Sequence, residues 1–452
     1  MSVETLLDAA SAVLEMSTRA GGGEADVVAA RSTDFEVKVA DGEIVTLTQA
    51  TSKGIGLRVF VGERMGFCTT SDFRPESLRE VVERAVAMAK ETADDPHNGL
   101  APELQAGRID AGADLDLYDP SIVALSTEEK IRWAHELEAA ARSVDPRVAK
   151  FQDSGVASGE SEQVMVTTGG AVRTTRGTGI SAWCCPIAEE NGDLQTEVWY
   201  DYRTHLEDLQ SMASIGRTAG ERAARMLGAR PVKTQNVAII FEPHMAAGLL
   251  GGMLGALDGD MVYKKASFLA DKLGEVIAAP GLTVIDDPLL PRGLATTPFD
   301  GEGLPTRRKA ILDAGRLTTF LYDAYTARKA GVAPTANARR GYSSLPSAGA
   351  FNFYVQAGTT PRDDILKGVD RALLVTRCLG RGVNAVSGEY SRGANGLWIE
   401  NGEVAYPVQE VTIAGDFIEM LKGIDAIGDD FQMRGSSGAP TLRIANMTVS
   451  GR

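Results

Sequence analysis

The sequence predicts an α+β protein with two domains, and three observations support this prediction. Short apolar runs that are typical of β-strands recur along the whole 452-residue chain. Amphipathic helical patterns separate them mainly in the first half, whereas glycine and short apolar runs dominate the second half. Gly228-Ala-Arg-Pro231 follows a predicted helix and precedes a hydrophobic strand, which places a domain boundary near residue 230. We expect residues 1–230 to form antiparallel strands with packed helices, and residues 231–452 to be dominated by a large antiparallel β-sheet.

The first element is a predicted helix over residues 3–19, where apolar residues share one helical face and Gly21-Gly-Gly23 ends the pattern. Another helix is predicted to begin after Ser126, because Glu129 follows at the spacing of a capping box. The predicted helices of the first half cover residues 3–19, 75–92, 127–144 and 209–227.

Strands and hairpin turns are predicted between these helices. The polar connection over residues 93–120 is long for a compact domain, so we expect it to cover a cleft or a partner. Strands are expected over residues 26–31, 35–39, 43–48, 56–61 and 65–70, and again between 148 and 202. Turns are expected at Asp41-Gly42, Gly62-Glu63, Ser158-Gly159, Gly169-Gly170 and Asn191-Gly192.

A glycine-rich helix is predicted in the second half, over residues 243–257, after a buried strand over residues 236–241. Apolar side chains fall on one stripe of this helix, and Gly248, Gly252 and Gly255 fall on another. Each glycine in a helix interior costs roughly 0.5–1 kcal/mol relative to alanine. The pattern therefore indicates a close approach, either to the protein's own sheet or in a functional groove. Further strands are expected over residues 282–286, 308–312, 351–355, 371–375, 396–400, 403–408, 410–413 and 441–444.

The amino-acid composition argues against several classes of function. The chain has 46 Lys plus Arg against 61 Asp plus Glu, a net charge of −15, which argues against nucleic acid as a partner. It has neither an apolar leader nor an apolar run of membrane-spanning length, so we expect a cytoplasmic protein without a membrane partner. Its four cysteines are too scattered for a disulfide scaffold, and its four histidines form no i, i+4 pair. The chain alone therefore offers few cysteine and histidine ligands for a zinc site.

Several segments resemble the TldD/PmbA family of zinc-dependent peptidases, also known as the modulator of DNA gyrase family. The match includes the strand over residues 236–241 and the glycine-rich segment over residues 248–260. It extends to residues 52–72 in the first half, 299–323 in the centre and 382–415 near the C-terminus. Together these segments form a specific match that runs through most of the chain.

The zinc-binding motif of that family is degenerate here. In the zinc-carrying branch the motif is H-E-x-x-x-H, which supplies two ligands and a general base. This chain has Gly251 and Gly252 where the first histidine and the glutamate would stand, and Ala256 where the second histidine would stand. Residues 428–452 also contain no counterpart of the family's third ligand, a cysteine. The chain thus resembles the PmbA (TldE) branch, which implies no catalytic residue and no metal in this chain, with zinc in a partner subunit.

Candidate substrate-binding residues remain in two glycine-punctuated segments. The segment over residues 388–396 is expected to be a loop that holds an extended peptide, unless its polar side chains merely face water. Glu302 could act with Asp300 as an acid/base pair, although acidic residues in such loops are more often solvated. The predicted substrate-binding residues are Glu302, Tyr390, Ser391, Arg392 and Asn395.

Other polar residues near the glycine-rich helix are expected to be structural. Asp258 and Asp260 are close enough to bind a hard cation, but two carboxylates fall short of a site. His244 stands near the helix start, where a lone histidine is usually a packing or capping residue.

Three functions are compatible with these observations, in decreasing order of preference. The first is a subunit of a cytoplasmic zinc metalloprotease that cleaves unfolded or extended peptides, in which a zinc-bearing homologue is the partner and this chain forms part of the substrate cavity. The second is a homodimeric peptide-binding or adaptor protein without hydrolytic activity. The third is an independent hydrolase that uses Asp258, Asp260 or Glu302 with an unsuspected metal.

Overall fold

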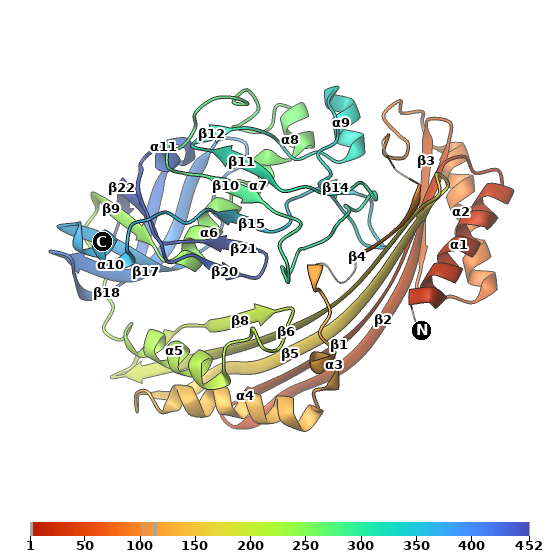
Figure 1. Cartoon of the computed structure of the whole chain (residues 1–452). Coiled ribbons are helices and arrows are strands. Elements are labelled where there is room, and N and C mark those ends of the chain that lie inside the picture. The colour runs from red at the N-terminus through yellow and green to blue at the C-terminus, as the bar shows by residue number, and fades with distance from the viewer. Residues whose placement is uncertain (1–2, 103, 105, 112–114, 452) are drawn as a thin grey trace.

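The computed structural model describes residues 3–102, 104, 106–111 and 115–451, and its fold class is α+β, as predicted (Figure 1). The first half forms one long, strongly curved sheet with helices on its outer side, and the second half sits above the concave side of that sheet. The second half of the chain thus faces the concave side of the sheet.

The curved sheet has the strand order β3-β2-β1-β5-β6-β4, with β7 and β8 added to β6. Its strands are longer than expected, because predicted neighbours fuse into single strands that pair along most of their length. The bounds are β1 Ala25–Ala40, β2 Glu43–Val61, β3 Arg64–Thr70, β4 Gly107–Ala111, β5 Val148–Thr167, β6 Ala171–Glu190, β7 Asp193–Thr196 and β8 Trp199–Arg203.

The turn predicted at Ser158-Gly159 is wrong. These residues lie inside β5, where Gly159 pairs with Asp34 of β1 and with Gly179 of β6. Ladders on both sides override the weak strand propensity of serine and glycine. The turns predicted at Asp41-Gly42, Gly62-Glu63, Gly169-Gly170 and Asn191-Gly192 do connect consecutive strands.

The helices of the first half cover the convex side of the sheet in two pairs (Figure 1). Helices α1 (Val3–Arg19) and α2 (Pro75–Glu91) pack on one end, and α4 (Thr127–Arg142) and α5 (Met212–Ala224) pack on the other. The predicted N-cap is present, since the Ser126 hydroxyl accepts a hydrogen bond from the Glu129 N–H at 3.1 Å. A short helix, α3 (Pro120–Ala124), precedes α4.

The second half contains two six-stranded sheets. In the first, the order is β18-β17-β16-β9-β22-β19, and an extra pairing of β18 with β22 closes five strands into a ring. In the second, the order is β12-β11-β10-β15-β21-β20. The bounds are β9 Gln235–Phe241, β10 Val284–Asp286, β11 Lys309–Asp313, β12 Arg316–Leu317, β15 Phe353–Val355, β16 Arg371–Leu379, β17 Glu389–Glu400, β18 Glu403–Asp416, β19 Ile424–Ile427, β20 Gln432–Arg434, β21 Ser437–Ala439 and β22 Leu442–Ser450, with a separate pair β13 Ala338–Arg339 and β14 Ser347–Ala348.

The glycine-rich helix is interrupted rather than continuous. Helix α6 (Pro243–Gly251) ends before two short helices, α7 (Leu254–Leu257) and α8 (Gly259–Tyr263). A Cβ on Gly252 would lie 3.0 Å from Val383, and one on Gly255 would lie 3.5 Å from Ala385. Close packing against the protein's own chain therefore accounts for Gly252, whereas a Cβ on Gly255 would make only an ordinary van der Waals contact. Three more short helices complete the half: α9 Ala324–Ala330, α10 Arg362–Lys367 and α11 Phe417–Lys422.

No helix among the described residues is long and apolar enough to cross a membrane.

Candidate functional site

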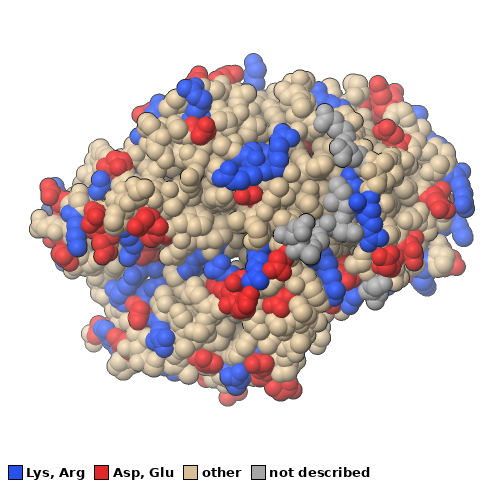
Figure 2. Space-filling view, viewed as in Figure 1, with Lys and Arg blue, Asp and Glu red and all other residues tan. Residues whose placement is uncertain are grey.

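A cavity of about 580 Å³ lies between the two halves of the chain. Figure 2 shows the hollow on the surface, with charged side chains of both signs near its rim. The concave face of β1, β2, β5 and β6 lines one side, and residues 293–301, 338–340 and Phe351 line the other. The predicted connection over residues 93–120 also reaches it, since Leu117 is part of the lining. The cavity is large enough for several residues of an extended peptide.

Small residues form the side of the cavity that belongs to the curved sheet. Gly159 of β5 pairs with Gly179 of β6, and Ser161 pairs with Gly177 two residues further on. A Cβ on Gly179 would lie 3.0 Å from the Tyr202 ring, so glycine there lets Tyr202 lie flat against the strand. The result is a broad surface of backbone and hydroxyl groups rather than of bulky side chains.

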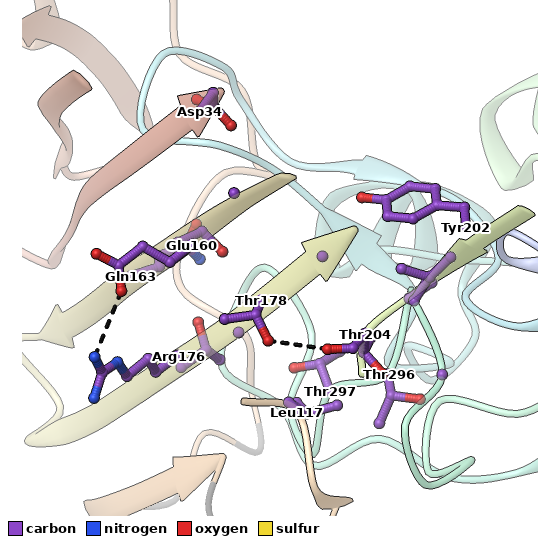
Figure 3. A pocket seen from close by; sticks show the side chains of 18 of the residues that line it. Asp34, Leu117, Glu160, Gln163, Arg176, Thr178, Tyr202, Thr204, Thr296 and Thr297 are labelled. Atoms are coloured by element: carbon purple, nitrogen blue, oxygen red, sulfur yellow. Dashed lines mark hydrogen bonds and ion pairs between the residues drawn. The ribbon is translucent and has the colours of Figure 1, made fainter. Parts of the chain in front are cut away.

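The charged groups of the cavity wall are held by neighbours (Figure 3). Arg176 lies 3.5 Å from the Glu160 carboxylate and donates a hydrogen bond to the Tyr118 hydroxyl at 2.6 Å. The Thr178 hydroxyl donates to the Thr204 carbonyl at 3.0 Å, which ties β6 to the segment after β8. This wall can offer hydrogen bonds to a peptide backbone without a large rearrangement of its own side chains.

A buried ionic network, formed by Asp26, Arg58, Glu302 and Arg340, joins the two halves beside the cavity. Arg58 of β2 contacts Asp26 of β1 at 2.5 Å and Glu302 at 3.3 Å, and Arg340 contacts Asp26 at 2.7 Å. Burial opposes ionisation of Asp26, but the two arginines hold the pKa of Asp26 below its ordinary value. Burial raises the pKa of Glu302, and Arg58 offsets only part of that rise.

Glu302 is buried in this network, whereas acidic residues in such a loop were expected to face water. Glu302 is 2% exposed, and its second oxygen accepts a hydrogen bond from the Ala324 N–H at 2.7 Å. Asp300 is equally buried and accepts hydrogen bonds from the N–H groups of Glu302, Leu304 and Ala338. Burial and the charge of Glu302 raise the pKa of Asp300 to about 7. Both carboxyl groups therefore organise the segment that borders the cavity, and Asp300 itself lines it.

The other predicted substrate-binding residues lie elsewhere. The segment over residues 388–396 was expected to be a loop, but residues 389–396 belong to β17, which pairs with β16 and β18 on either side. Tyr390 is 2% exposed and stacks on Phe417 with a centroid distance of 6.4 Å, whereas Ser391 is exposed. Tyr390, Ser391, Arg392 and Asn395 are absent from the described lining of the cavity.

The cavity-lining residues of β5 and β6 were not among the site residues predicted from the sequence. A signal was available, because Gly155, Gly159, Gly177 and Gly179 fall at even spacings within strand-like segments and so share one face. The turn predicted at Ser158-Gly159 interrupted this strand in the prediction, so the shared face of the glycines was not recognised.

The positions of the degenerate motif do not fit a zinc ion. Gly251, Gly252 and Ala256 carry no side-chain donor atom, and Ala256 is fully buried. Among the residues that the structure describes, no group of three or more His, Cys, Asp or Glu side chains is arranged to hold a metal ion.

The remaining polar residues near α6 have structural contacts. Asp258 caps α8 by accepting a hydrogen bond from the Asp260 N–H at 2.9 Å, and Asp260 pairs with Lys264 at 2.5 Å. His244 packs edge-on against Trp199, and burial together with the nearby Arg222 lowers the pKa of His244 to about 4. These contacts agree with the structural roles expected from the sequence.

Comparison with known proteins identifies the family. Three domain profiles of the PmbA/TldA metallopeptidases match in chain order: domain 1 over residues 25–89, the central domain over residues 120–227 and the C-terminal domain over residues 234–451. The chain belongs to the TldD/PmbA metallopeptidase family. The first two matched segments contribute to the same curved sheet. The gap between the second and third segments lies where the chain passes from its first half to its second half.

Relatives match over nearly the full length. The chain is 34% identical over 448 residues to the metalloprotease PmbA of Escherichia coli O157:H7, covering 99% of this chain and 96% of the relative. It is 31% identical over 450 residues to a PmbA homologue of Haemophilus influenzae, with the same coverage. A crystal structure from Bacteroides thetaiotaomicron, named for modulators of DNA gyrase, superposes with a TM-score of 0.90 at 28% identity and covers 98% of both chains.

Proposed function

We propose that this chain is the zinc-free subunit of a cytoplasmic metalloprotease of the TldD/TldE type, which cleaves unfolded or extended peptides. A zinc-bearing homologue supplies the metal, the general base and the activated water. This chain supplies one wall of the substrate cavity. The observation that carries the proposal is the absence of any donor atom at Gly251, Gly252 and Ala256, inside a chain that otherwise matches the family along its length.

The cavity between the halves supports the peptide part of the proposal. Its lining from β5 and β6 is rich in glycine, serine and threonine, which leaves room for a main chain and offers hydroxyl groups to it. Both relatives reported above are named metalloprotease PmbA or a homologue of it, and PmbA is the branch that this sequence resembles.

A homodimeric peptide-binding or adaptor protein without hydrolytic activity is the alternative. The same cavity would serve a peptide-binding protein equally well. The two functions differ in whether mixing the chain with a zinc-bearing homologue produces peptide cleavage. An independent hydrolase has less support, because the oxygens of Asp258, Asp260 and Glu302 already accept hydrogen bonds or pair with cations of this chain.

The decisive experiment measures bound zinc and cleavage of denatured casein for the chain alone, for a homologue with an intact H-E-x-x-x-H motif, and for their mixture. We expect the lone chain to be zinc-free and inert and the mixture to cleave faster than the homologue alone. A homologue whose motif glutamate is replaced by glutamine serves as the control and should give an inert mixture. Stoichiometric zinc and cleavage in the lone chain would overturn the proposal.

A second experiment tests the cavity wall directly. A Cβ on Gly177 would meet its first neighbour only at 3.4 Å, so Gly177→Leu should fold while it fills part of the cavity. We expect the KM of the mixture for casein to rise about tenfold with little change in thermal stability. Gly281→Leu, at an exposed site in the second half with a similar 3.5 Å first contact, is the matched control and should leave KM unchanged. An unchanged KM for Gly177→Leu would place the substrate elsewhere.

A further inference from the structure

A carboxylate and an aromatic ring lie on the same face of the curved sheet, within the cavity. Asp34 of β1 pairs with Gly159 of β5, and Gly159 pairs with Gly179 of β6. Tyr202 of β8 pairs with Ser181, two residues from Gly179 along β6. Because side chains alternate between the two faces of a strand, Asp34 and Tyr202 point to the same face of the sheet. Both residues line the cavity (Figure 3).

The two glycines between Asp34 and Tyr202 leave room for a ligand. A Cβ on Gly159 would lie 2.9 Å from the Asp34 carboxylate, and one on Gly179 would lie 3.0 Å from the Tyr202 ring. Each of the two side chains therefore lies over a glycine, and bare backbone separates them. Burial and then the charge of Asp34 raise the pKa of Tyr202, as expected for a phenol near a carboxylate. Asp34 is exposed and Tyr202 is 43% exposed, so both can contact a molecule in the cavity.

Asp34 is an exposed carboxylate of the lining that has no cation beside it. It accepts a hydrogen bond from the Ser32 hydroxyl at 2.8 Å, and no Lys, Arg or His among the described residues forms an ion pair with it. The other charged groups of the lining have partners: Glu36 has Lys38 at 3.3 Å, Glu160 has Arg176 at 3.5 Å, Arg340 has Asp26 at 2.7 Å, Arg339 has the Ala350 carbonyl at 2.8 Å, and Asp300 has the N–H groups described above.

We propose that Asp34 and Tyr202 form a subsite for a basic side chain of the substrate, so that the cavity prefers peptides that contain lysine or arginine. A carboxylate attracts a cation directly, and an aromatic ring attracts it through the negative charge of its π face. The two glycines leave space for the long aliphatic stem of such a side chain. This inference rests on the peptide-binding part of the proposed function and names the substrate class for that site.

The preference is confined to one position of the peptide. Along β5 and β6, the cross-strand pairs that flank Gly159 and Gly179 on the same face are Ala157 with Ser181 and Ser161 with Gly177. These pairs are small and uncharged, so they accept a main chain without selecting the charge of its side chains. One basic residue is therefore enough for recognition.

Binding to the purified full chain alone, without any homologue, tests the subsite. Isothermal titration calorimetry at low ionic strength compares three acetylated and amidated peptides that differ only in a central lysine, glutamine or glutamate. Blocking both termini leaves the central side chain as the source of any charge effect. We expect the lysine peptide to bind about tenfold more tightly than the glutamine peptide, and the glutamate peptide to bind more weakly than both.

Variants of the two residues assign the preference. Asp34→Asn should reduce the ratio of the glutamine to the lysine dissociation constant to about threefold or less, because only the aromatic ring then attracts the cation. Asp34→Lys should reverse the preference in favour of the glutamate peptide. Tyr202→Leu should lower the ratio, and Tyr202→Phe should restore it. Asp313→Asn, at an exposed position of β11, is the matched control and should keep the original ratio.

Four results would each overturn the inference: no binding of the lysine peptide, equal dissociation constants for the lysine and glutamine peptides, an unchanged ratio in Asp34→Asn, or a lysine preference that persists in Asp34→Lys. Failure of the proposed function gives a different result. A charge preference in the lone chain together with an inert mixture would contradict only the zinc-dependent cleavage, whereas a cleaving mixture without charge preference would contradict only this inference.

Discussion

At the scale of the residue, the most informative group is Asp300. Burial and the nearby charge of Glu302 raise its pKa from the ordinary 3.8 to about 7, so the folded state binds the proton more tightly than the unfolded state. The stability that this group contributes is therefore fully present below about pH 4 and is lost as pH rises through about 7. Asp26, whose pKa is lowered, acts in the opposite direction and only below its ordinary pKa. The two effects are thus separated in pH.

The variant Asp300→Asn removes this titration and should make the free energy of unfolding depend less steeply on pH between 4.5 and 7.5, where Glu302, whose pKa is also raised, still contributes. Its amide nitrogen cannot accept the hydrogen bonds that both carboxyl oxygens accept, so we also expect a loss of about 1–3 kcal/mol at pH 5. Urea unfolding at several pH values measures both effects. Asp313→Asn, at an exposed position of β11, should behave as the original chain. A profile as steep as the original for Asp300→Asn would contradict the argument.

At the scale of the element, the sequence predicted helices better than strands. The bounds of α1, α2 and α4 agree with prediction to within two residues, because each has a continuous apolar face and a recognisable start or stop. The prediction for residues 388–396 was wrong because the glycines there suggested a loop. In the structure, β16 and β18 pair with this segment and hold it as a strand. The missing information is long-range pairing, which no local pattern contains.

The glycines of α6 allow a prediction at the same scale. Gly248 lies inside the helix and is exposed, and a Cβ there would meet nothing within 4 Å. Gly248→Ala should therefore stabilise the chain by about 0.5–1 kcal/mol. Gly252→Leu should destabilise it, because its Cβ already comes within 3.0 Å of Val383. Thermal unfolding of both variants measures the contrast, and equal melting temperatures would contradict it.

Cleavage by Gly248→Ala tests whether the exposed face of this helix contacts a substrate or a partner. If nothing packs against Gly248, cleavage by the mixture with the zinc-bearing homologue should stay at the original rate. A stabilised variant whose mixture loses activity would instead place a substrate or partner backbone against this face.

At the scale of the whole molecule, the buried network of Asp26, Arg58, Glu302 and Arg340 fixes one half of the chain on the other. The sequence could not predict it, since Arg58 and Glu302 are separated by 244 residues. Arg58 is 4% exposed, and its loss would leave Glu302 buried without its cation, while Asp26 would keep Arg340. Removing one partner of a buried ion pair typically costs about 3–5 kcal/mol.

We therefore expect Arg58→Met to lower the free energy of unfolding by about 3–5 kcal/mol, and Arg79→Met, at an exposed position of α2, to have almost no effect. Because the penalty comes from an uncompensated carboxylate, the double variant Arg58→Met/Glu302→Gln should be more stable than Arg58→Met alone. Urea unfolding of the three variants measures this coupling. If Glu302→Gln added further destabilisation to Arg58→Met, the cost would lie in lost packing rather than in the buried charge, and the network would not hold the two halves together by ion pairing.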